Sequence, residues 1–375
     1  MYKKVSYWEQ NTFLKEIDLV VVGSGIVGLS AALSYKERFP KRKIVVLEKG
    51  SLPTGASTKN AGFACFGSIT ELVADLEQHG EEMVVDLVKK RWDGLHKLRE
   101  RVGDRTMNYR EYGGFELLLE DENTEKMEAY IPFFNDRLKS VIGVQDVFSK
   151  MDNAWRKMGF GKKGLLIKNK AEGQIHPGKM MVKLLKLARR KAITILNGCE
   201  VQEVSEGRET VHISSNVFDC EARQVLFATN GFTTRLFPDL LIQPARNQVI
   251  LTEVIPNLKL KGCFHFEEGY YYFRNIGQRI LLGGARNIAK KEETTDEFGS
   301  TKVIQQQLSA FLHEIILPDQ AVAIEHSWSG ILGIGPTKSP IVQKLSGRMA
   351  VAVRLGGMGV AIGSLVGEAG ALLFE

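Results

Sequence analysis

A glycine-rich segment near the start of the chain has the spacing of a site for the phosphates of a dinucleotide. In such a G-x-G-x-x-G segment the first glycine permits a tight turn, the second lets backbone N–H groups approach a pyrophosphate, and the third lets a helix pack closely on a strand. The carboxylate of Glu48, 20 residues after the last glycine, would accept hydrogen bonds from a ribose diol and repel a 2′-phosphate. The chemistry indicated is binding of an ADP-containing cofactor. The segment consists of Gly23, Ser24, Gly25, Ile26, Val27 and Gly28.

A second segment, residues 269–274, carries groups that could bind a substrate. In a strand, Tyr270, Tyr272 and Arg274 would share one face, because alternate residues point the same way. Two phenols and a guanidinium on one face could bind the carboxylate of an amino acid, the guanidinium through a bidentate fork. The alternative is an aromatic strand whose arginine is solvated at the sheet edge. Further candidates are Gln248, which could also be a buried structural amide, and Arg246 or Arg354 as another carboxylate anchor.

The residues around the first glycines predict the elements that would position them. Residues 17–22 and 44–48 are apolar and predict two strands, with a helix between them that begins at the glycines. The positive end of this helix would face the phosphates. A purely structural glycine turn is the alternative, but strand, helix, second strand and carboxylate occur here in the order that a dinucleotide site requires.

The rest of the chain predicts two inserted regions and a return to the same pattern. Helices are expected over residues 71–105, 121–139, 179–191 and 302–315. Strands are expected over residues 115–119, 193–196, 201–204, 211–213, 225–228, 247–254, 269–274, 279–284 and 349–354. We therefore expect a discontinuous layout, with a nucleotide-binding domain formed by residues 1–70, 160–238 and 322–375 and a substrate domain formed by residues 71–159 and 239–321.

Composition narrows the class of protein. With 375 residues, 44% of them hydrophobic, the chain can bury a large core and exceeds the usual size of one domain. The net charge of +6 is mild and the basic residues are spread along the chain, which favours solvated helix faces over nucleic-acid binding. We find no secretory signal and no apolar run long enough to span a membrane, so we expect a soluble cytoplasmic protein whose oligomeric state stays open.

The cysteines and histidines predict neither a disulfide framework nor a metal site. The four cysteines are scattered, form no C-x-x-C pair, and fit reduced thiols in the cytosol. The seven histidines are scattered too, and none is paired with a cysteine or carboxylate at ligand spacing. The cysteines are Cys65, Cys199, Cys220 and Cys263.

A glycine-rich turn close to the end of the chain narrows the choice of cofactor. It follows an expected strand and precedes an apolar helix, and a helix N-terminus suits a negatively charged group such as the N1/O2 edge of a reduced flavin. A turn that serves packing alone is the alternative. The chain has one full fingerprint with a downstream acidic residue, and so no clear second site for NAD(P)H. The turn consists of Gly356, Gly357, Met358, Gly359 and Val360.

Several further motifs, taken in order, make the chain resemble the FAD-dependent D-amino-acid oxidase family, specifically its glycine oxidase and sarcosine oxidase branch. They lie at residues 55–62, 173–177, 227–231, 243–248 and 328–330, and the terminal glycine turn completes the set. The resemblance is spread over nearly the whole chain. It implies an α/β fold with a Rossmann-like FAD-binding domain and a discontinuous α+β substrate domain that combines an antiparallel sheet with helices.

The resemblance also implies how FAD would bind. The ADP part would lie on the first glycines and Glu48, the middle along residues 57–62, and the flavin ring against the terminal glycine turn. Related sarcosine oxidases attach the flavin through a cysteine in the region that matches residues 328–358. This chain has no cysteine there, so FAD is expected to bind non-covalently. The further contacts implied are those of Lys49, Ser57, Asn60, Ala61, Gly62 and Val201.

The implied reaction is oxidation of a C–N bond by hydride transfer to flavin N5, which gives an imine that water hydrolyses. The substrate would be a small amine or (D-)amino acid, and the electron acceptor O2 or another redox carrier. Residues 331–334 lack the carboxylate-binding arginine of glycine oxidases, and Met358 stands where relatives often have histidine. These departures favour a bulkier amine, a D-amino acid gripped by Arg274 or Arg354, or a polyamine conjugate over glycine and sarcosine.

Two other functions stay open at this point. A 2-hydroxyacid or glycerophosphate dehydrogenase of the same fold would need a base for the hydroxyl proton, and His265 and His326 are the candidates for it. A flavin-binding protein without catalytic activity would explain the missing arginine.

Overall fold

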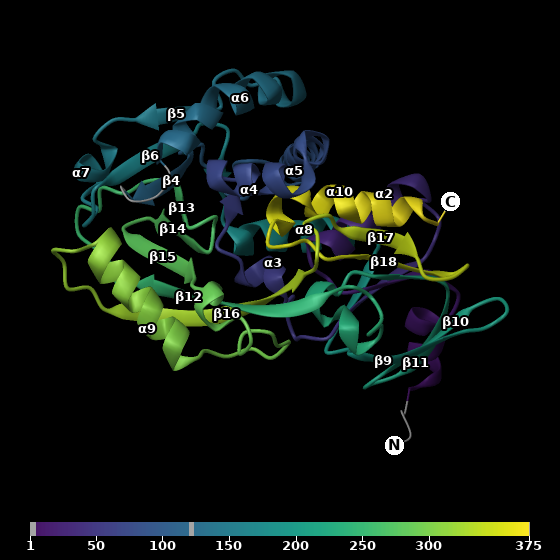
Figure 1. Cartoon of the computed structure of the whole chain (residues 1–375). Coiled ribbons are helices and arrows are strands. Elements are labelled where there is room, and N and C mark those ends of the chain that lie inside the picture. The colour runs from purple at the N-terminus through teal and green to yellow at the C-terminus, as the bar shows by residue number, and fades with distance from the viewer. Residues whose placement is uncertain (1–4, 120–123, 375) are drawn as a thin grey trace.

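The chain folds around two eight-stranded sheets whose strands come from alternating parts of the sequence. In the computed structural model, which describes residues 5–119 and 124–374, one sheet occupies each end of the molecule (Figure 1). A small third sheet pairs β3 (Phe63–Ala64) with β7 (Gly173–Gln174). Residues 121–123 of the helix predicted over 121–139 lie outside the described residues, and the rest of it belongs to α6 (Thr124–Ile142).

The first sheet is mainly parallel and carries the glycine-rich segment. Its path is β17-β18-β11-β1-β2-β8, and β10 and β9 extend it beside β11. Strand β1 pairs in parallel with both β2 and β11, and β18 pairs in parallel with β11. The bounds are β1 (Ile17–Val22), β2 (Ile44–Glu48), β8 (Thr194–Asn197), β9 (Val201–Glu206), β10 (Val211–Ser215), β11 (Asp219–Phe227), β17 (Ile341–Lys344) and β18 (Met349–Val353).

Both faces of this sheet are covered, which explains why most residues of its strands β1 and β2 are apolar. Leu19 and Val21 of β1 face a core shared with four helices, whereas Val20 and Val22 face a second core that includes β10. Helix α10 lies against α2, as Figure 1 shows. The helices are α2 (Ile26–Arg38), α5 (Glu81–Val102), α8 (Pro177–Arg190) and α10 (Gly359–Leu372).

The second sheet is mixed and carries the predicted substrate residues. Its order is β16-β12-β15-β14-β13-β4-β6-β5; β13 pairs in parallel with β4, and the other pairs are antiparallel. One face packs on α9 (Lys302–Phe311), and the β4–β6 end packs on α6 and on α4 (Ile69–His79). The bounds are β4 (Gly114–Leu119), β5 (Phe148–Met151), β6 (Gly164–Asn169), β12 (Gln243–Thr252), β13 (Cys263–Phe266), β14 (Tyr271–Ile276), β15 (Arg279–Gly284) and β16 (Ile324–Ile334).

Two strands pair in the second sheet although the predicted domain division placed them with the first. Residues 164–169, expected in the nucleotide-binding domain, form β6 between β4 and β5 of the second sheet. Residues 324–334, also expected there, form β16 along the whole of β12. β16 pairs with β12 and β6 pairs with β4, partners distant in the sequence, so local composition does not reveal to which sheet these strands belong.

Most predicted elements differ from the observed bounds by a few residues, and two differ for a clear physical reason. The helix expected over 71–105 is two helices, α4 and α5, because Gly80 between them has φ +82° and ends the first. The strand expected from residue 269 begins at Tyr271, because Glu267, Glu268 and Gly269 form a turn with positive φ. The short helices are α1 (Tyr7–Glu9), α3 (Ala56–Lys59) and α7 (Ala154–Met158). Among the described residues, none of the helices has the length and apolar character needed to cross a membrane.

Candidate active site

The first glycines form the turn that their spacing predicts. Gly23 follows β1 with φ +102°, in the region that favours glycine. A Cβ at Gly28 would lie 1.9 Å from the carbonyl oxygen of Gly23, so this position must be glycine for α2 to pack against the turn. The backbone N–H of Ile26, the first residue of α2, donates to Ser57 Oγ at 3.0 Å. The start of α2 therefore presents its N–H groups and its positive end to the segment that carries Ser57.

Glu48 lies at the carboxyl end of β2, beside this turn. One carboxylate oxygen accepts hydrogen bonds from the N–H of Ser24 at 3.0 Å and from its hydroxyl at 2.7 Å, and the other accepts from the N–H of Gly50 at 3.0 Å. The side chain is buried, and it lines a groove over the glycines. These bonds fix the carboxylate where the strand ends and leave further acceptor positions for a ligand.

The structure brings most of the predicted cofactor residues to this groove. Twelve of them line it: Gly23, Gly25, Ile26, Val27, Glu48, Lys49, Ser57, Asn60, Val201, Gly357, Gly359 and Val360. Ser24 is buried beneath it against Glu48, and Gly28 is buried in α2. The sequence prediction missed several other lining residues from the segment after β11, the loop before α9 and β16, among them Thr229, Phe232, Arg235, Phe298 and Ile331.

The groove fits the ADP half of FAD. A Cβ at Gly25 would lie 2.8 Å from Ser57 Oγ, so the glycine keeps open the space between the start of α2 and the loop opposite. Backbone N–H groups at a helix start and a carboxylate at the end of the next strand are the groups that bind a pyrophosphate and a ribose diol. When bound, FAD supplies a hydride acceptor.

The groove continues into a second cavity. Five residues line both, namely Ala56, Asn60, Leu332, Gly357 and Val360. The remaining predicted cofactor residues, Ala61, Gly62, Gly356 and Met358, line the second cavity. Its far wall comes from β12, β13 and β14 of the second sheet. The cavity therefore lies where the two sheets meet, with the glycine turns on one side and the tyrosine-rich strand on the other.

Tyr270 and Tyr272 lie in this wall, as predicted from their spacing. Tyr272 is packed edge-on against Phe63, with 5.6 Å between ring centroids, and its ring fills the space beside Gly283. Burial raises the pKa of Tyr272, so its phenol keeps its proton. Asn247 and Val249 of β12 complete this part of the wall.

Arg274 has a different role from the one predicted. Its guanidinium Nη1 donates to the carbonyl oxygens of Gly62 at 3.1 Å and Ile175 at 2.8 Å, and the side chain is buried. Burial lowers the pKa of Arg274. It is not among the residues that line the cavity. In this structure Arg274 ties the loop that follows α3 to the segment before α8, and we do not place it on a substrate carboxylate.

Gln248 and Arg246 also face away from the cavity. The Gln248 amide donates to Glu293 Oε1 at 2.9 Å and to Thr301 Oγ1 at 2.8 Å, and Arg246 forms a bidentate pair with Glu293 at 2.9 and 3.0 Å. Alternate strand residues point to opposite faces, so Asn247 and Val249 reach the cavity instead. The prediction of Gln248 as a lining residue had the right strand and the wrong face.

Arg354, predicted as a carboxylate anchor, and His326, predicted as a base, also lie outside the cavity lining. Arg354, with φ +63°, donates to the carbonyl oxygens of Ser339 and Leu241. His326 has a side chain that is 64% exposed on β16 and lies 3.7 Å from Glu325, outside the cavity lining.

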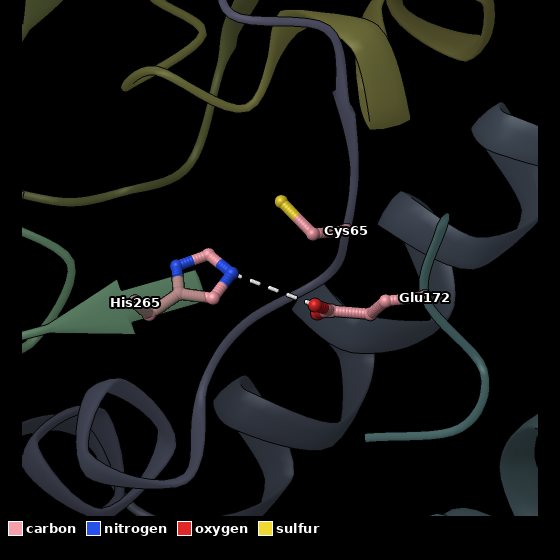
Figure 2. Close-up of side chains that lie close together, drawn as sticks. All are labelled: Cys65, Glu172 and His265. Atoms are coloured by element: carbon pink, nitrogen blue, oxygen red, sulfur yellow. Dashed lines mark ion pairs between the residues drawn. The ribbon is translucent and has the colours of Figure 1, made fainter. Parts of the chain in front are cut away.

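Three side chains that the sequence did not connect meet at the cavity wall (Figure 2). Glu172 Oε1 accepts hydrogen bonds from the N–H groups of Phe66 at 3.1 Å and Gly67 at 3.3 Å, and Glu172 Oε2 lies 3.5 Å from His265 Nε2. Cys65 completes the group, and its three candidate ligand atoms lie within 4.8 Å of one another. We had expected no such cluster, because its members are more than 90 residues apart in sequence. A metal ion could use such a set, but no other contact of these residues points to one.

A buried ion-pair network lies beside this cluster. Glu71 is 3.2 Å from Arg91 and 3.1 Å from Lys338, and Lys338 also pairs with Asp75 at 2.8 Å. Burial alone would raise the pKa of Glu71, but Arg91 and Lys338 outweigh it and lower the pKa below its ordinary value. Glu71 and Lys338 line the cavity as an already neutralised pair.

Comparison with known proteins agrees with this architecture. A family model described as FAD dependent oxidoreductase (DAO) matches residues 18–373. The probable oxidoreductase OrdL of Haemophilus influenzae is 22% identical over 375 residues, which covers 95% of this chain and 82% of that protein. Two solved structures are similar in fold. L-proline dehydrogenase from P. horikoshii has a TM-score of 0.77 at 16% identity and covers 96% of this chain and 94% of that one. Glycine oxidase from Geobacillus kaustophilus has a TM-score of 0.73 at 17% identity, covering 93% and 92%.

A family match across this length, together with the groove that the glycines and Glu48 form, identifies both the fold and the cofactor. The chain belongs to the DAO family of FAD-dependent oxidoreductases.

Proposed function

We propose that this enzyme oxidises the C–N bond of a small amine or amino acid, with hydride transfer to flavin N5 and hydrolysis of the resulting imine. The observation that carries the proposal is the continuity of the nucleotide groove with the cavity walled by Tyr272 and His265. A dinucleotide whose ADP half occupies the groove has its other half directed into that cavity. The names of the similar structures, a proline dehydrogenase and a glycine oxidase, support an amine or amino acid as the substrate class.

The residues of the cavity suit hydride transfer, which needs positioning more than acid–base machinery. Tyr272, Val249 and Phe63 provide an aromatic and apolar wall that would hold a substrate and exclude water. The glycine turn and the start of α10 form the opposite side. The N-terminal end of α10 favours negative charge, and it would stabilise charge that develops there during reduction.

A 2-hydroxyacid or glycerophosphate dehydrogenase is the second candidate. It needs a base for the hydroxyl proton, and the position of His265 in the cavity wall favours it over His326 as that base. The same fold would then serve oxidation of a C–O bond.

The test is anaerobic mixing of the holoenzyme with amines, D- and L-amino acids, polyamine conjugates, 2-hydroxyacids and glycerophosphate, with flavin absorbance followed. We expect bleaching by one of the amine classes. Bleaching by hydroxy compounds alone would favour the second candidate, and no bleaching by any class would overturn both. Admission of air to the bleached enzyme then tells whether O2 or another redox carrier accepts the electrons, because only an oxidase is rapidly reoxidised.

A further inference from the structure

We propose that His265, held by Glu172, is the group that removes the proton from the substrate ammonium before oxidation. This inference rests on the proposed amine oxidation. An alkylammonium group has an ordinary pKa of about 10 and carries no free electron pair on nitrogen. One N–H proton must therefore leave before the adjacent carbon can give up a hydride to form the C=N bond. In the proposed step that proton passes to His265, the nitrogen regains its electron pair, and the imidazole becomes an imidazolium beside the Glu172 carboxylate.

The geometry of the pair suits this role. Glu172 is fixed by the backbone N–H groups of Phe66 and Gly67 on one oxygen, and its other oxygen faces His265 Nε2 (Figure 2). The second ring nitrogen, Nδ1, points away from Glu172 and lies 3.9 Å from where a Cβ on Gly269 would be. Gly269 and His265 both line the cavity. One ring nitrogen thus meets a fixed carboxylate and the other lies toward Gly269 in the cavity lining, which is the base-and-orienter arrangement of acid–base sites.

The other titratable groups of the cavity are less suited to accept this proton. The Glu71 carboxylate is neutralised by Arg91 and Lys338. The phenol of Tyr272 and the thiol of Cys65 keep their protons, since burial raises the pKa of both. Four other titratable side chains line the cavity. Lys59 and Arg286 are cations. The other two, Tyr270 and the exposed carboxylate Glu268, lie on the turn before β14.

The surroundings of His265 strengthen it as a base. Burial alone would lower the pKa of His265, but the Glu172 carboxylate 3.5 Å away and the negative charges of Glu116 and Glu71 raise it above its ordinary value. The cations Arg91 and Lys338 face Glu71 from the other side, and Cys65 lies beside the ring as a neutral thiol. Glu172 is thus a positioning residue that also stabilises the imidazolium.

The decisive experiment compares the pH dependence of anaerobic flavin reduction by an amine substrate in His265→Gln, Glu172→Gln and the unmodified holoenzyme. In the unmodified enzyme the rate should rise with pH as the imidazole loses its proton. We expect H265Q to be slower at pH 7 by about 100-fold and to recover above pH 10, where the free amine is abundant. E172Q should shift the profile to lower pH, because removal of the carboxylate lowers the pKa of His265. A defect that is merely structural would lower the rate equally at all pH values.

The matched control is His326→Gln, the same change at an exposed histidine outside the cavity, and it should keep the unmodified profile. A second readout does not depend on turnover. In NMR spectra of protein with isotope-labelled histidine side chains, the imidazole resonance that is missing from H265Q belongs to His265. In E172Q this resonance should titrate at lower pH than in the unmodified protein. Cys65→Ser should keep the pH dependence of the unmodified enzyme.

The outcomes separate the two proposals. If amines do not reduce the flavin of the unmodified enzyme, amine oxidation itself is wrong. If amines reduce it and H265Q keeps the unmodified profile, the role of His265 is wrong while the proposed function stands. If C65S and H265Q lose activity in the same way and zinc restores the unmodified enzyme after chelation, the cluster holds a metal and the proton-transfer role is overturned.

Discussion

Gly25 and Gly55 line the same groove, yet only one of them leaves no room for a side chain. A Cβ at Gly25 would lie 2.8 Å from Ser57 Oγ, whereas a Cβ at Gly55 would have no heavy atom of the described residues within 4 Å, its own chain neighbours aside. Both have φ values that any residue can adopt, −72° and −74°. The difference between them is therefore one of space, and it makes the pair a matched test of the cofactor groove.

We expect Gly25→Ala to weaken FAD binding by at least about tenfold, or about 1.4 kcal/mol, because the methyl group occupies the approach to the pyrophosphate. Titration of the apoprotein with FAD, followed by flavin fluorescence, measures the effect. Gly55→Ala is the control and should bind nearly as the unmodified protein does. Equal losses for the two variants would show that the groove does not hold the pyrophosphate at Gly25.

Arg274 offers a test of structural against substrate-binding roles. In Arg274→Met two buried carbonyl oxygens, those of Gly62 and Ile175, lose their donor, and we expect the free energy of unfolding to fall by about 2–4 kcal/mol. Urea denaturation measures it, and Arg223→Met at an exposed arginine is the control, with an expected change below about 0.5 kcal/mol. Unchanged stability with a raised KM for an amino-acid substrate would instead restore the carboxylate-binding role that the sequence suggested.

At the scale of elements, helices α2, α5 and α10 approach one another through glycines. A Cβ at Gly367 of α10 would lie 2.4 Å from the carbonyl oxygen of Val27 in α2, and one at Gly94 of α5 would lie 2.4 Å from that of Ala361 in α10. Backbone atoms cannot move aside as side-chain ends do. The position of α10, whose first residues line both cavities, therefore depends on these close contacts.

Gly367→Ala should destabilise the protein by about 1–3 kcal/mol through overpacking. The same change at an exposed glycine in the middle of a helix would instead raise the free energy of unfolding by up to about 1 kcal/mol, because alanine has the better helix propensity. Thermal and urea unfolding provide the measurement. Gly347→Ala is the control, because within residues 5–119 and 124–374 a Cβ there would approach only Glu206 Oε1, at 3.6 Å. Stabilisation by G367A would mean that the two helices are not in close contact.

Features of the fold and site could be predicted from the sequence where the residues that determine them are close together in the chain. Strands β1 and β2 and the roles of Gly23, Gly28 and Glu48 follow from a continuous segment, and the predicted strands have the bounds observed. Strand β16 was not predicted, because its partner β12 is some 80 residues away in the sequence. Gln248 was placed on the right strand but the wrong face, since the facing of a strand residue depends on the register of the whole sheet. The Glu172–His265 pair has no local signal at all.

At the scale of the molecule, an ion-pair network crosses from α4 to the segment between β16 and β17. Lys338 of that segment pairs with Glu71 and Asp75 of α4, and Arg91 of α5 pairs with Glu71. Buried pairs of this kind stabilise a fold mainly by avoiding an uncompensated charge. The network therefore makes stability depend on the ionisation of Glu71.

The pKa of Glu71 is lowered in the folded protein, so its contribution is fully present above the unfolded pKa of about 4.3 and is lost as pH falls through the lower, folded value. Glu71→Gln should destabilise the protein by about 3–5 kcal/mol at pH 7, because Arg91 is left buried without its partner. The difference between the variant and the unmodified protein should shrink as pH falls below about 4. Urea unfolding at several pH values measures both; a difference independent of pH would show that Glu71 is not ionised in the native state.

The strand order of the first sheet determines when, during translation, the cofactor groove can form. Strands β1 and β2 are synthesised before β11, and β11 also pairs with β18, which ends more than 300 residues after β2 at Val353. The groove over the glycines is likewise closed by residues from 355 to 360. A nascent chain therefore carries the complete dinucleotide fingerprint long before it can retain a dinucleotide. Retention of FAD therefore requires that synthesis has passed residue 360, because residues 355–360 complete the groove.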